Sequence, residues 1–207
     1  MLSLDVLWAD EALVAVHKPA GMLSVPGRGD DKQDCASVRV QQQYPDALIV
    51  HRLDMATSGI LLMARGVDAQ RRLGIAFARR EVHKRYVAVV HGRVMPMRGE
   101  IDLPLIADWP QRPRQKVDPV LGKPSLTRYR CLGHDAAADT TRLDLEPVTG
   151  RSHQLRVHLL AIGHPIVGDA LYGDAAGSDR LMLHASELSV PHPSDGRMLC
   201  LRSEAPF

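Results

Sequence analysis

Cysteine and aromatic residues are scarce in this sequence, and the few cysteines stand far apart. Cys35, Cys131 and Cys200 are the only three cysteines, and no CxxC pair occurs. An odd number of widely spaced cysteines indicates neither a disulfide framework nor a thiolate zinc site, and it favours a cytoplasmic protein. Aromatic residues make up 4% of the chain, so each ring can be considered on its own.

Long apolar runs and a strong net charge are also missing. The N-terminal stretch "MLSLDVLWADEALVAVHKP" lacks the basic and then apolar regions of a secretory signal. No segment approaches the roughly 20 apolar residues of a membrane-spanning helix, so we expect no membrane partner. The net charge is only +2, from 26 Lys and Arg against 24 Asp and Glu, and it does not by itself require a nucleic-acid partner.

Several familiar catalytic patterns are absent. His153 and His158 would point about 140° apart on a helix, which is too far to share a metal, and no HExxH pattern occurs. No GxSxG elbow surrounds Ser58, and neither a P-loop nor a Rossmann glycine pattern is present. The sequence therefore predicts no metal, ATP or dinucleotide cofactor.

What the sequence does contain is a series of short apolar runs bounded by turn residues, which predicts an α+β fold. We expect strands over residues 5–8, 12–18, 59–65, 86–92, 126–132, 141–148, 181–190 and 197–202. We expect helices over residues 35–45, 68–81 and 152–163, the last with Leu155, Leu159 and Ile162 as its buried stripe. Too few helices occur for repeated βαβ units, which favours a mixed, mostly antiparallel sheet with flanking helices. No domain boundary is evident, and we expect a single domain over residues 1–207.

Asp54 stands out in "HRLDMATSGILLMAR", residues 51–65, because it lies in a loop next to a buried strand. A carboxylate in such a place must be hydrated, paired with a cation or used in chemistry. The Gly- and Pro-rich stretch over residues 18–31 indicates an ordered loop beside a site.

Two further stretches carry candidate functional residues. In residues 149–169 the predicted helix would place Ser152, His153 and Arg156 on one polar, positive face, although a solvated helix start is an equally good explanation. In "HKRYVAVVHG", strand alternation sends Tyr86 to one face and Arg85 to the other, and filling the core is the simpler role for Tyr86.

Together these stretches resemble the RluA family of RNA pseudouridine synthases. The segment "VHKPAGMLSVPG" is similar to the N-terminal strand and loop of that family, "HRLDMATSG" to its catalytic motif, "KRYVAVVHG" to its tyrosine motif, and "GRSHQLRVHLLAIGHPIVGD" to its arginine motif. "DLPLIADWPQRPRQKV" and "GKPSLTRY" resemble members that modify both ribosomal and transfer RNA. The resemblance implies the pseudouridine synthase fold, with a central RNA-binding cleft.

The resemblance also implies a mechanism. Asp54 matches the catalytic aspartate, Tyr86 the active-site tyrosine, and Arg156 the arginine that pairs with the aspartate. The N1–C1′ bond of uridine would break, the uracil would rotate, and C5 would be joined to C1′, without a cofactor. Asp54 could attack C1′, attack the ring, or assist elimination of a ribose proton, and the sequence leaves these routes open. Tyr86 could stack on the base or act through its hydroxyl.

The implied partner is RNA, in stem-loops of ribosomal RNA, transfer RNA or both. By resemblance, Arg52 enters the space left by the flipped base, where a planar guanidinium can stack and reach phosphate. Two basic clusters gain weight as RNA contacts, because single-stranded loops are bound through stacking and charge. The full set of predicted RNA contacts is Arg52, His51, Thr57, Arg79, Arg80, Lys84, Arg85, Trp109, Arg112, Arg114, Lys116, Arg151 and His153.

Two other function classes compete with this interpretation. A noncatalytic RNA-binding protein could retain the fold, although Asp54, Tyr86 and Arg156 are all present. A carboxylate-dependent glycosidase normally needs a second Asp or Glu, and the matched motifs contain no partner carboxylate. Because the "HKPAG" segment begins at His17, we expect no N-terminal S4 domain, and we expect a monomer.

Overall fold

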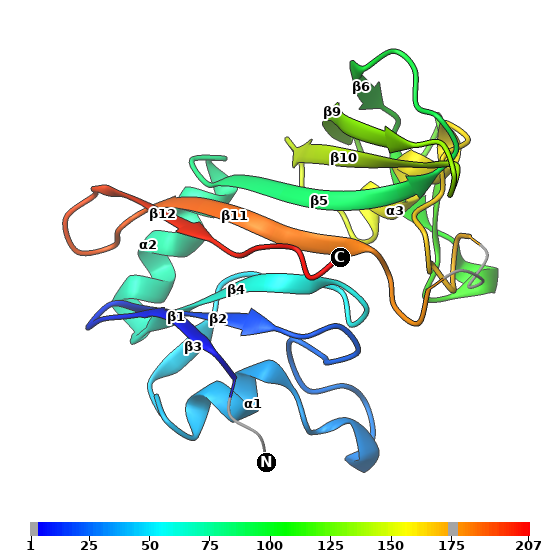
Figure 1. Ribbon diagram of the computed structural model, residues 1–207. Helices are drawn as coiled ribbons and strands as arrows, with labels where there is room; N and C mark the ends of the chain where they lie inside the picture. Colours follow the sequence, from blue (N-terminus) through cyan, green and yellow to red (C-terminus); the bar gives the residue numbers. More distant parts are fainter. Residues whose placement is uncertain (1–3, 174–177) are drawn as a thin grey trace. The chain divides into compact units, whose positions relative to one another are not determined.

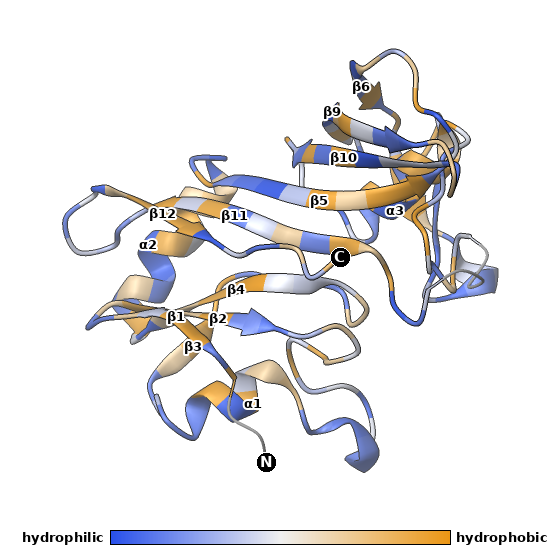
Figure 2. Ribbon diagram, in the orientation of Figure 1, coloured by the Kyte–Doolittle hydropathy of each residue, from blue (hydrophilic) through white to orange (hydrophobic). Residues whose placement is uncertain are grey.

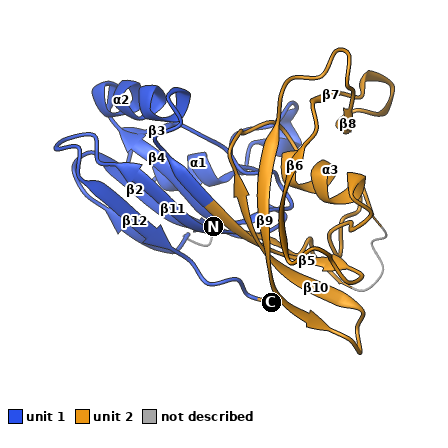
Figure 3. Ribbon diagram, turned by 90° about the horizontal axis from the view of Figure 1, so that it is seen from above, with its two compact units in different colours: residues 1–84, 185–206 blue, residues 85–184, 207 orange. Residues whose placement is uncertain are grey.

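The computed structural model describes residues 4–173 and 178–207, which divide into two compact units. Unit 1 spans residues 1–84 and 185–206, and unit 2 spans residues 85–184 together with Phe207 (Figure 3). The division falls inside two strands, β5 (His83–His91) and β11 (Leu183–Pro191). Apart from Phe207, unit 2 is a continuous stretch of chain inserted between the two parts of unit 1.

Unit 1 is built on antiparallel strand pairs. Besides most of β11, its strands are β1 (Val6–Ala9), β2 (Leu13–Lys18), β3 (Ala47–Ile49), β4 (Ser58–Arg65) and β12 (Met198–Arg202) (Figure 1). β1 pairs with β2, both β2 and β3 pair with β4, and β12 pairs with β11. The strand β4 thus lies between neighbours, and it leads directly out of the Asp54 loop.

The strands β2 and β4 are apolar over residues 13–16 and 59–64, because both of their faces are covered there. Residues of β2 and β4 that point to one side pack with Leu73 of α2 (Val67–Ala78), and those that point to the other side pack with Val40 of α1 (Ala36–Gln41). The buried residues of α2 follow the i, i+4, i+7 pattern, and Figure 2 shows hydrophobic and hydrophilic residues alternating along this helix. Pairing with β2, from Leu13 opposite Ala64 to Lys18 opposite Gly59, gives the register of β4 and therefore the start of the strand after Asp54.

Gly59, in the second position of β4, is required by its surroundings. Its φ is +118°, and a Cβ atom added there would overlap the backbone carbonyl of Ala185. A side chain at this position would therefore push β4 away from the backbone of β11 at Ala185. This close approach explains the glycine in the "ATSG" part of the catalytic motif.

Unit 2 contains four strands that pair antiparallel within the sheet and a separate hairpin. The sheet has the order β5, β10 (Thr140–Pro147), β9 (Leu126–Asp135) and β6 (Arg98–Asp102). The hairpin consists of β7 (Leu105–Ala107) and β8 (Gln115–Val117), joined by a segment that contains the 3₁₀ turn Trp109–Gln111. One face of the sheet is apolar, with Ala88, Val90, Leu143 and Leu145 all buried, and α3 (Gln154–Ala161) makes hydrogen bonds to β9.

The expected α+β architecture is confirmed, with two kinds of difference. The short strands β3, β6, β7 and β8 were not predicted, because they have three to five residues each and lack a clear apolar alternation. The third helix begins at Gln154 rather than at residue 152, and His153 before it has a left-handed backbone with φ 53°. The common helical face predicted for Ser152, His153 and Arg156 is therefore wrong.

Candidate active site

Asp54 lies in a short segment that the loop after β2 holds on both sides. Ser24 donates its hydroxyl to the Leu53 carbonyl at 2.8 Å and accepts the Leu53 N–H at 3.0 Å. On the other side, the Met55 carbonyl accepts from the Lys18 ammonium at 3.2 Å and from the Gly21 N–H at 2.9 Å. Lys18 is fully buried and also donates to two carbonyls of its own loop. The residues before and after Asp54 are thus fixed in place, as an ordered loop beside a site requires.

His51 is held by contacts within unit 1, and its predicted RNA contact stays a prediction. Its Nε2 accepts the Leu62 N–H at 2.9 Å, and its ring stacks on Phe77 with 5.2 Å between centroids. Burial and the nearby Lys84 ammonium lower the pKa of His51 to about 4, which keeps Nε2 unprotonated and able to accept. This hydrogen bond ties the chain just before Arg52 to β4.

Thr57 and Arg52 differ in exposure although both lie close to Asp54 in sequence. Arg52 is exposed, which suits a side chain that enters RNA. Thr57 is buried, and its N–H donates to the Asp54 carbonyl at 3.1 Å, closing the turn that follows the aspartate. Its burial favours a role in shaping this turn over the predicted RNA contact.

Arg156 is buried on α3 and forms a bidentate ion pair with Asp169. Its Nε and Nη2 donate to the two carboxylate oxygens at 2.8 and 2.6 Å, and both side chains are almost fully buried. Burial opposes ionisation of Asp169, but Arg156 and the N–H groups of Leu171 and Tyr172 outweigh it and lower the pKa of Asp169. Sequence analysis did not anticipate this partner. Asp54 and Arg156 belong to different units, and their pairing stays a prediction.

The start of α3 is fixed by Gln154, whose side chain joins the helix to β9. Its Oε1 accepts from the Thr149 hydroxyl and the Arg151 N–H, and its Nε2 donates to Thr127 Oγ1 and to the Leu126 carbonyl. The exposed Arg151 donates to the Pro124 carbonyl at 3.3 Å. These bonds set the position from which Arg156 projects, two residues along the helix.

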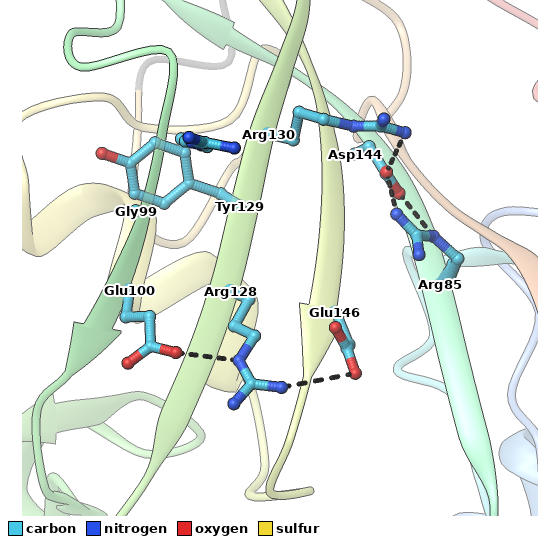
Figure 4. A pocket seen from close by; sticks show the side chains of 9 residues that line it. Arg85, Gly99, Glu100, Arg128, Tyr129, Arg130, Asp144 and Glu146 are labelled. Atoms are coloured by element: carbon cyan, nitrogen blue, oxygen red, sulfur yellow. Dashed lines mark hydrogen bonds and ion pairs between the residues drawn. The ribbon is translucent and has the colours of Figure 1, made fainter.

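Tyr86 and Arg85 lie on opposite faces of β5, as alternation predicts. Tyr86 is opposite Leu145 of β10, on the same face as the buried apolar residues of the sheet. Arg85 lies on the other face, where it and Arg130 both bind the carboxylate of Asp144 (Figure 4). This second face holds a cavity of about 420 Å³ lined by Arg, Glu and Asp side chains. Arg85 is thus already paired within unit 2, and its predicted RNA contact would compete with Asp144.

The first basic cluster lies where α2 ends. Arg79 caps the helix, Arg80 follows with φ 60°, and both side chains are exposed. Cations are also favoured at a helix C-terminus in the absence of any ligand. Lys84 is partly buried, and burial lowers its pKa.

The second basic cluster occupies the hairpin β7–β8 and its connecting segment. Trp109 is 67% exposed, and the Arg112 guanidinium lies over its ring, with Cζ 3.0 Å from the ring centroid. Arg114 binds the side chain of Gln111 at 2.9 Å, and Lys116 is exposed. The hairpin therefore presents a flat cationic surface of the kind that can stack on a nucleic-acid base.

Residues 4–173 and 178–207 show neither a metal-binding cluster nor a membrane-spanning helix. This part of the chain contains no cluster of three or more His, Cys, Asp or Glu that could hold a metal ion. In the same residues, no helix has the length and apolar character needed to cross a membrane.

Comparison with known proteins identifies the family of this chain. The model of the RNA pseudouridylate synthase family matches residues 12–161, which is more than half of the chain. This chain belongs to the RNA pseudouridylate synthase family. The matched range contains Asp54, Tyr86 and Arg156, and the family resemblance of the sequence is confirmed. Members of this family are isomerases, and the chain is placed among enzymes accordingly.

Individual relatives of this pseudouridine synthase cover nearly its whole length. The dual-specificity RNA pseudouridine synthase RluA of Escherichia coli K12 is 48% identical over 207 residues, covering 99% of this chain and 94% of the relative. The protein of the same name from Vibrio parahaemolyticus is 50% identical over 195 residues, covering 91% of this chain and 78% of the relative. Among solved structures, human RNA pseudouridylate synthase domain containing 1 superposes with a TM-score of 0.83 at 29% identity, covering 99% of this chain and 84% of that one. The fold class is therefore that of the pseudouridine synthases.

Sequence reasoning missed the residues that hold the Asp54 segment in unit 1 and those that hold Arg156 in unit 2. Lys18 and Ser24 were seen only as part of a glycine-rich loop, and Asp169 and Tyr172 were not singled out. The sequence signals that could have identified them are "HKPAG", which contains Lys18, and "VGD", which contains Asp169. A buried lysine next to a turn, and an aspartate at the end of an arginine motif, both require partners.

Proposed function

We propose that this RNA pseudouridine synthase isomerises uridines in stem-loops of ribosomal RNA, transfer RNA or both, with Asp54 as its nucleophile. The observation that carries the proposal is the likeness to the dual-specificity relatives over 99% of the chain. The Trp109 region supports the same target class, because it was the part of the sequence that resembles dual-specificity members. We further propose that the enzyme acts as a monomer in the cytoplasm and needs no cofactor.

The reaction rearranges bonds within one nucleoside. The N1–C1′ bond breaks, the uracil turns, the C5–C1′ bond forms, and the proton lost from C5 is balanced by a proton gained at N1. An ionised Asp54 supplies the electron pair, whether at C1′, at the ring or toward a ribose proton. The hydrogen bonds at Leu53 and Met55 fix the backbone on both sides of Asp54, so that this loop needs little reorganisation during the reaction.

Arg156 and Tyr86 supply the remaining groups. Arg156 pairs with Asp54 and keeps it ionised when RNA excludes water, while Asp169 binds its Nε and Nη2 edge and sets its orientation. Tyr86 provides a flat ring for the base and a hydroxyl near the carbon that loses its proton. Stacking is the role that its position on an apolar sheet face favours.

RNA recognition combines base flipping with a cationic surface. A uridine in a structured loop must leave its stack, at a cost on the order of a few kcal/mol. Arg52 is exposed beside Asp54 and can fill the vacated space. Trp109, Arg112 and Lys116 on the hairpin and Arg79 and Arg80 after α2 are exposed, which supports contacts with phosphates and bases outside the target.

The experiment that tests the proposal compares Asp54→Asn with the wild type on RNA labelled with tritium at carbon 5. The substitution keeps the shape of the side chain and removes its charge, so tritium release should stop while RNA binding and melting temperature stay near wild type. Asp68→Asn, an exposed carboxylate on α2 with a side chain 91% exposed, is the matched control and should leave the rate unchanged. Activity of Asp54→Asn within tenfold of wild type contradicts the nucleophile assignment.

The targets and the noncatalytic alternative are tested separately. Sequencing ribosomal and transfer RNA for pseudouridine after incubation with the pure wild-type protein identifies the modified positions. RNA binding by the wild type without any tritium release would favour a noncatalytic RNA-binding protein.

A further inference from the structure

Tyr172 lies where three functional segments of unit 2 meet. Its hydroxyl accepts the backbone N–H of Gln115, at the start of β8, at 2.7 Å. The same hydroxyl is 2.7 Å from Nδ1 of His153, the residue that precedes α3. Its ring lies under the guanidinium of Arg156, with Cζ 5.0 Å from the ring centroid, and its N–H donates to Asp169. One side chain thus contacts the hairpin, the start of α3 and the arginine.

The hydroxyl and the ring of Tyr172 have separable functions. The hydroxyl binds the hairpin β7–β8, which carries Trp109, Arg112 and Lys116. The ring covers one face of the Arg156 guanidinium, while Asp169 takes the edge formed by Nε and Nη2. The ring and Asp169 therefore contribute to the orientation of Arg156. The hydroxyl adds a direct link from the start of β8 to the segment beside Arg156, in addition to the backbone bonds between Leu105 and Lys123.

We propose that Tyr172 is a positioning residue that holds the RNA-contacting hairpin at a fixed place relative to Arg156. RNA that is bound by the hairpin then has its target uridine at a fixed distance from Arg156. The inference rests on the proposed roles of Arg156 and of the hairpin residues. It predicts that hairpin contacts and Tyr172 contribute to one common step, the docking of structured RNA.

Tyr172→Phe tests the role of the hydroxyl because it keeps the ring. Loss of the hydroxyl should raise the Kd for a target stem-loop by about threefold to tenfold, the effect of roughly one net hydrogen bond. The single-turnover rate at saturating RNA should fall by less than about threefold, since the ring still covers Arg156. Tyr129→Phe, on β9 of the same unit, is the matched control and should change neither quantity.

Gln115→Pro provides a second variant that acts from the hairpin side. Proline lacks the N–H that Tyr172 accepts, and the two-stranded hairpin leaves this N–H directed away from β7, where proline is tolerated. This variant should show the same rise in Kd as Tyr172→Phe. It also keeps the test available if Tyr172→Phe proves unstable on thermal unfolding.

A double-mutant cycle then links Tyr172 to the hairpin. If both act in docking, Tyr172→Phe combined with Trp109→Ala should raise Kd by clearly less than the product of the two single effects. The inference is overturned if the effects multiply, if neither single variant changes Kd, or if the saturating rate falls while Kd does not. These outcomes compare the Kd and the saturating rate of each variant with those of the wild type. Failure of the proposed function is a different result, a wild type that forms no pseudouridine.

Discussion

Arg156 and Asp169 constrain each other in the interior of unit 2. Burying two charges costs several kcal/mol of desolvation, which is recovered only when the geometry is good and the remaining polar atoms are satisfied. Here Asp169 Oδ1 accepts from Arg156, Leu171 and Tyr172, and Oδ2 accepts a further bond from Arg156. An arrangement with so many partners orients the guanidinium more firmly than a single ion pair would.

Asp169→Asn should therefore harm both stability and catalysis. The variant keeps the shape of the side chain but leaves Arg156 without its charged partner, so the free energy of unfolding should fall by about 3 kcal/mol. The saturating single-turnover rate should fall at least tenfold, because Arg156 loses its fixed orientation. Urea unfolding and quenched-flow assays measure the two effects.

The control for this variant is Asp195→Asn, which breaks the exposed pair between Asp195 and Arg197. Surface pairs contribute little, so this variant should match the wild type in both assays. Wild-type rates for Asp169→Asn would show that Asp169 does not position Arg156.

Arg52 separates base flipping from the chemistry that follows it. If its guanidinium fills the vacated stack, Arg52→Ala loses a stacking contact worth roughly 1 to 3 kcal/mol, and the loss should be large on a structured stem-loop. On an unstructured oligonucleotide with the same target sequence, flipping costs little and most of the defect should disappear. Single-turnover rates on the two RNAs give the comparison.

The matched control is Arg71→Ala, an exposed arginine on α2 that should have no effect on either RNA. An equal loss for Arg52→Ala on both RNAs would assign Arg52 to the catalytic centre instead.

Among the elements, the loop after β2 is the one that shapes the catalytic segment. It bonds to Leu53 through Ser24 and to Met55 through Lys18, so Asp54 is held between two anchored neighbours. The sequence predicted an ordered loop here from its Gly and Pro content. It could not show that the lysine would bind the Met55 carbonyl, because that contact joins residues that are 37 positions apart.

Lys18→Met should loosen this loop. The methionine keeps the length of the buried side chain but leaves three carbonyls without the ammonium, so we expect the free energy of unfolding to fall by about 3 kcal/mol. Turnover should fall as well, since Met55 is no longer fixed. Lys32→Met, an exposed lysine of the same region, is the control and should leave unfolding unchanged. Equal unfolding curves for Lys18→Met and wild type would show that these bonds are dispensable.

The helices and longer strands were predictable because their periodicity is local. Leu155 and Leu159 are buried as the i, i+4 spacing predicts, whereas Ile162 lies just past the end of α3 and is only half-buried. The strand β4 is apolar over residues 59–64. The candidate catalytic residues were identified by motif, and the Asp169 partner of Arg156 was not, because a partner 13 residues away leaves no periodic trace. His153 shows the other limit, since a left-handed residue moved the helix start beyond it.

At the scale of the whole molecule, stability should fall as the solution becomes acidic, partly through His51. Its pKa is about 4 in the folded chain and about 6.5 when unfolded, so the unfolded chain binds more protons between these values. Its contribution is fully present above about pH 6.5 and is lost as the pH falls toward 4. Because the His51 side chain is partly exposed, we expect its contribution to the free energy of unfolding to be about 2 kcal/mol.

His51→Gln tests this, because an amide oxygen can still accept the Leu62 N–H but does not titrate. Between pH 7 and 4.5, the free energy of unfolding should decline less steeply for this variant than for the wild type. His83→Gln, at an exposed histidine, should keep the wild-type slope. Identical slopes for His51→Gln and wild type would contradict the assignment.

The insertion of unit 2 within unit 1 sets an order for synthesis on the ribosome. Leu188, Val190 and Leu201 belong to the same core cluster as Leu13 and Leu62, but they are translated after all of residues 85–184. Unit 2 is nearly continuous in the chain and can fold as it emerges, since contiguous units fold during translation. The strands β2 and β4 must wait about a hundred residues, roughly 5 to 20 s at usual elongation rates, before the C-terminal residues of their core cluster join those of α2. The nascent protein therefore passes through a period in which the segment carrying Asp54 is exposed to aggregation and to chaperones before its core can close.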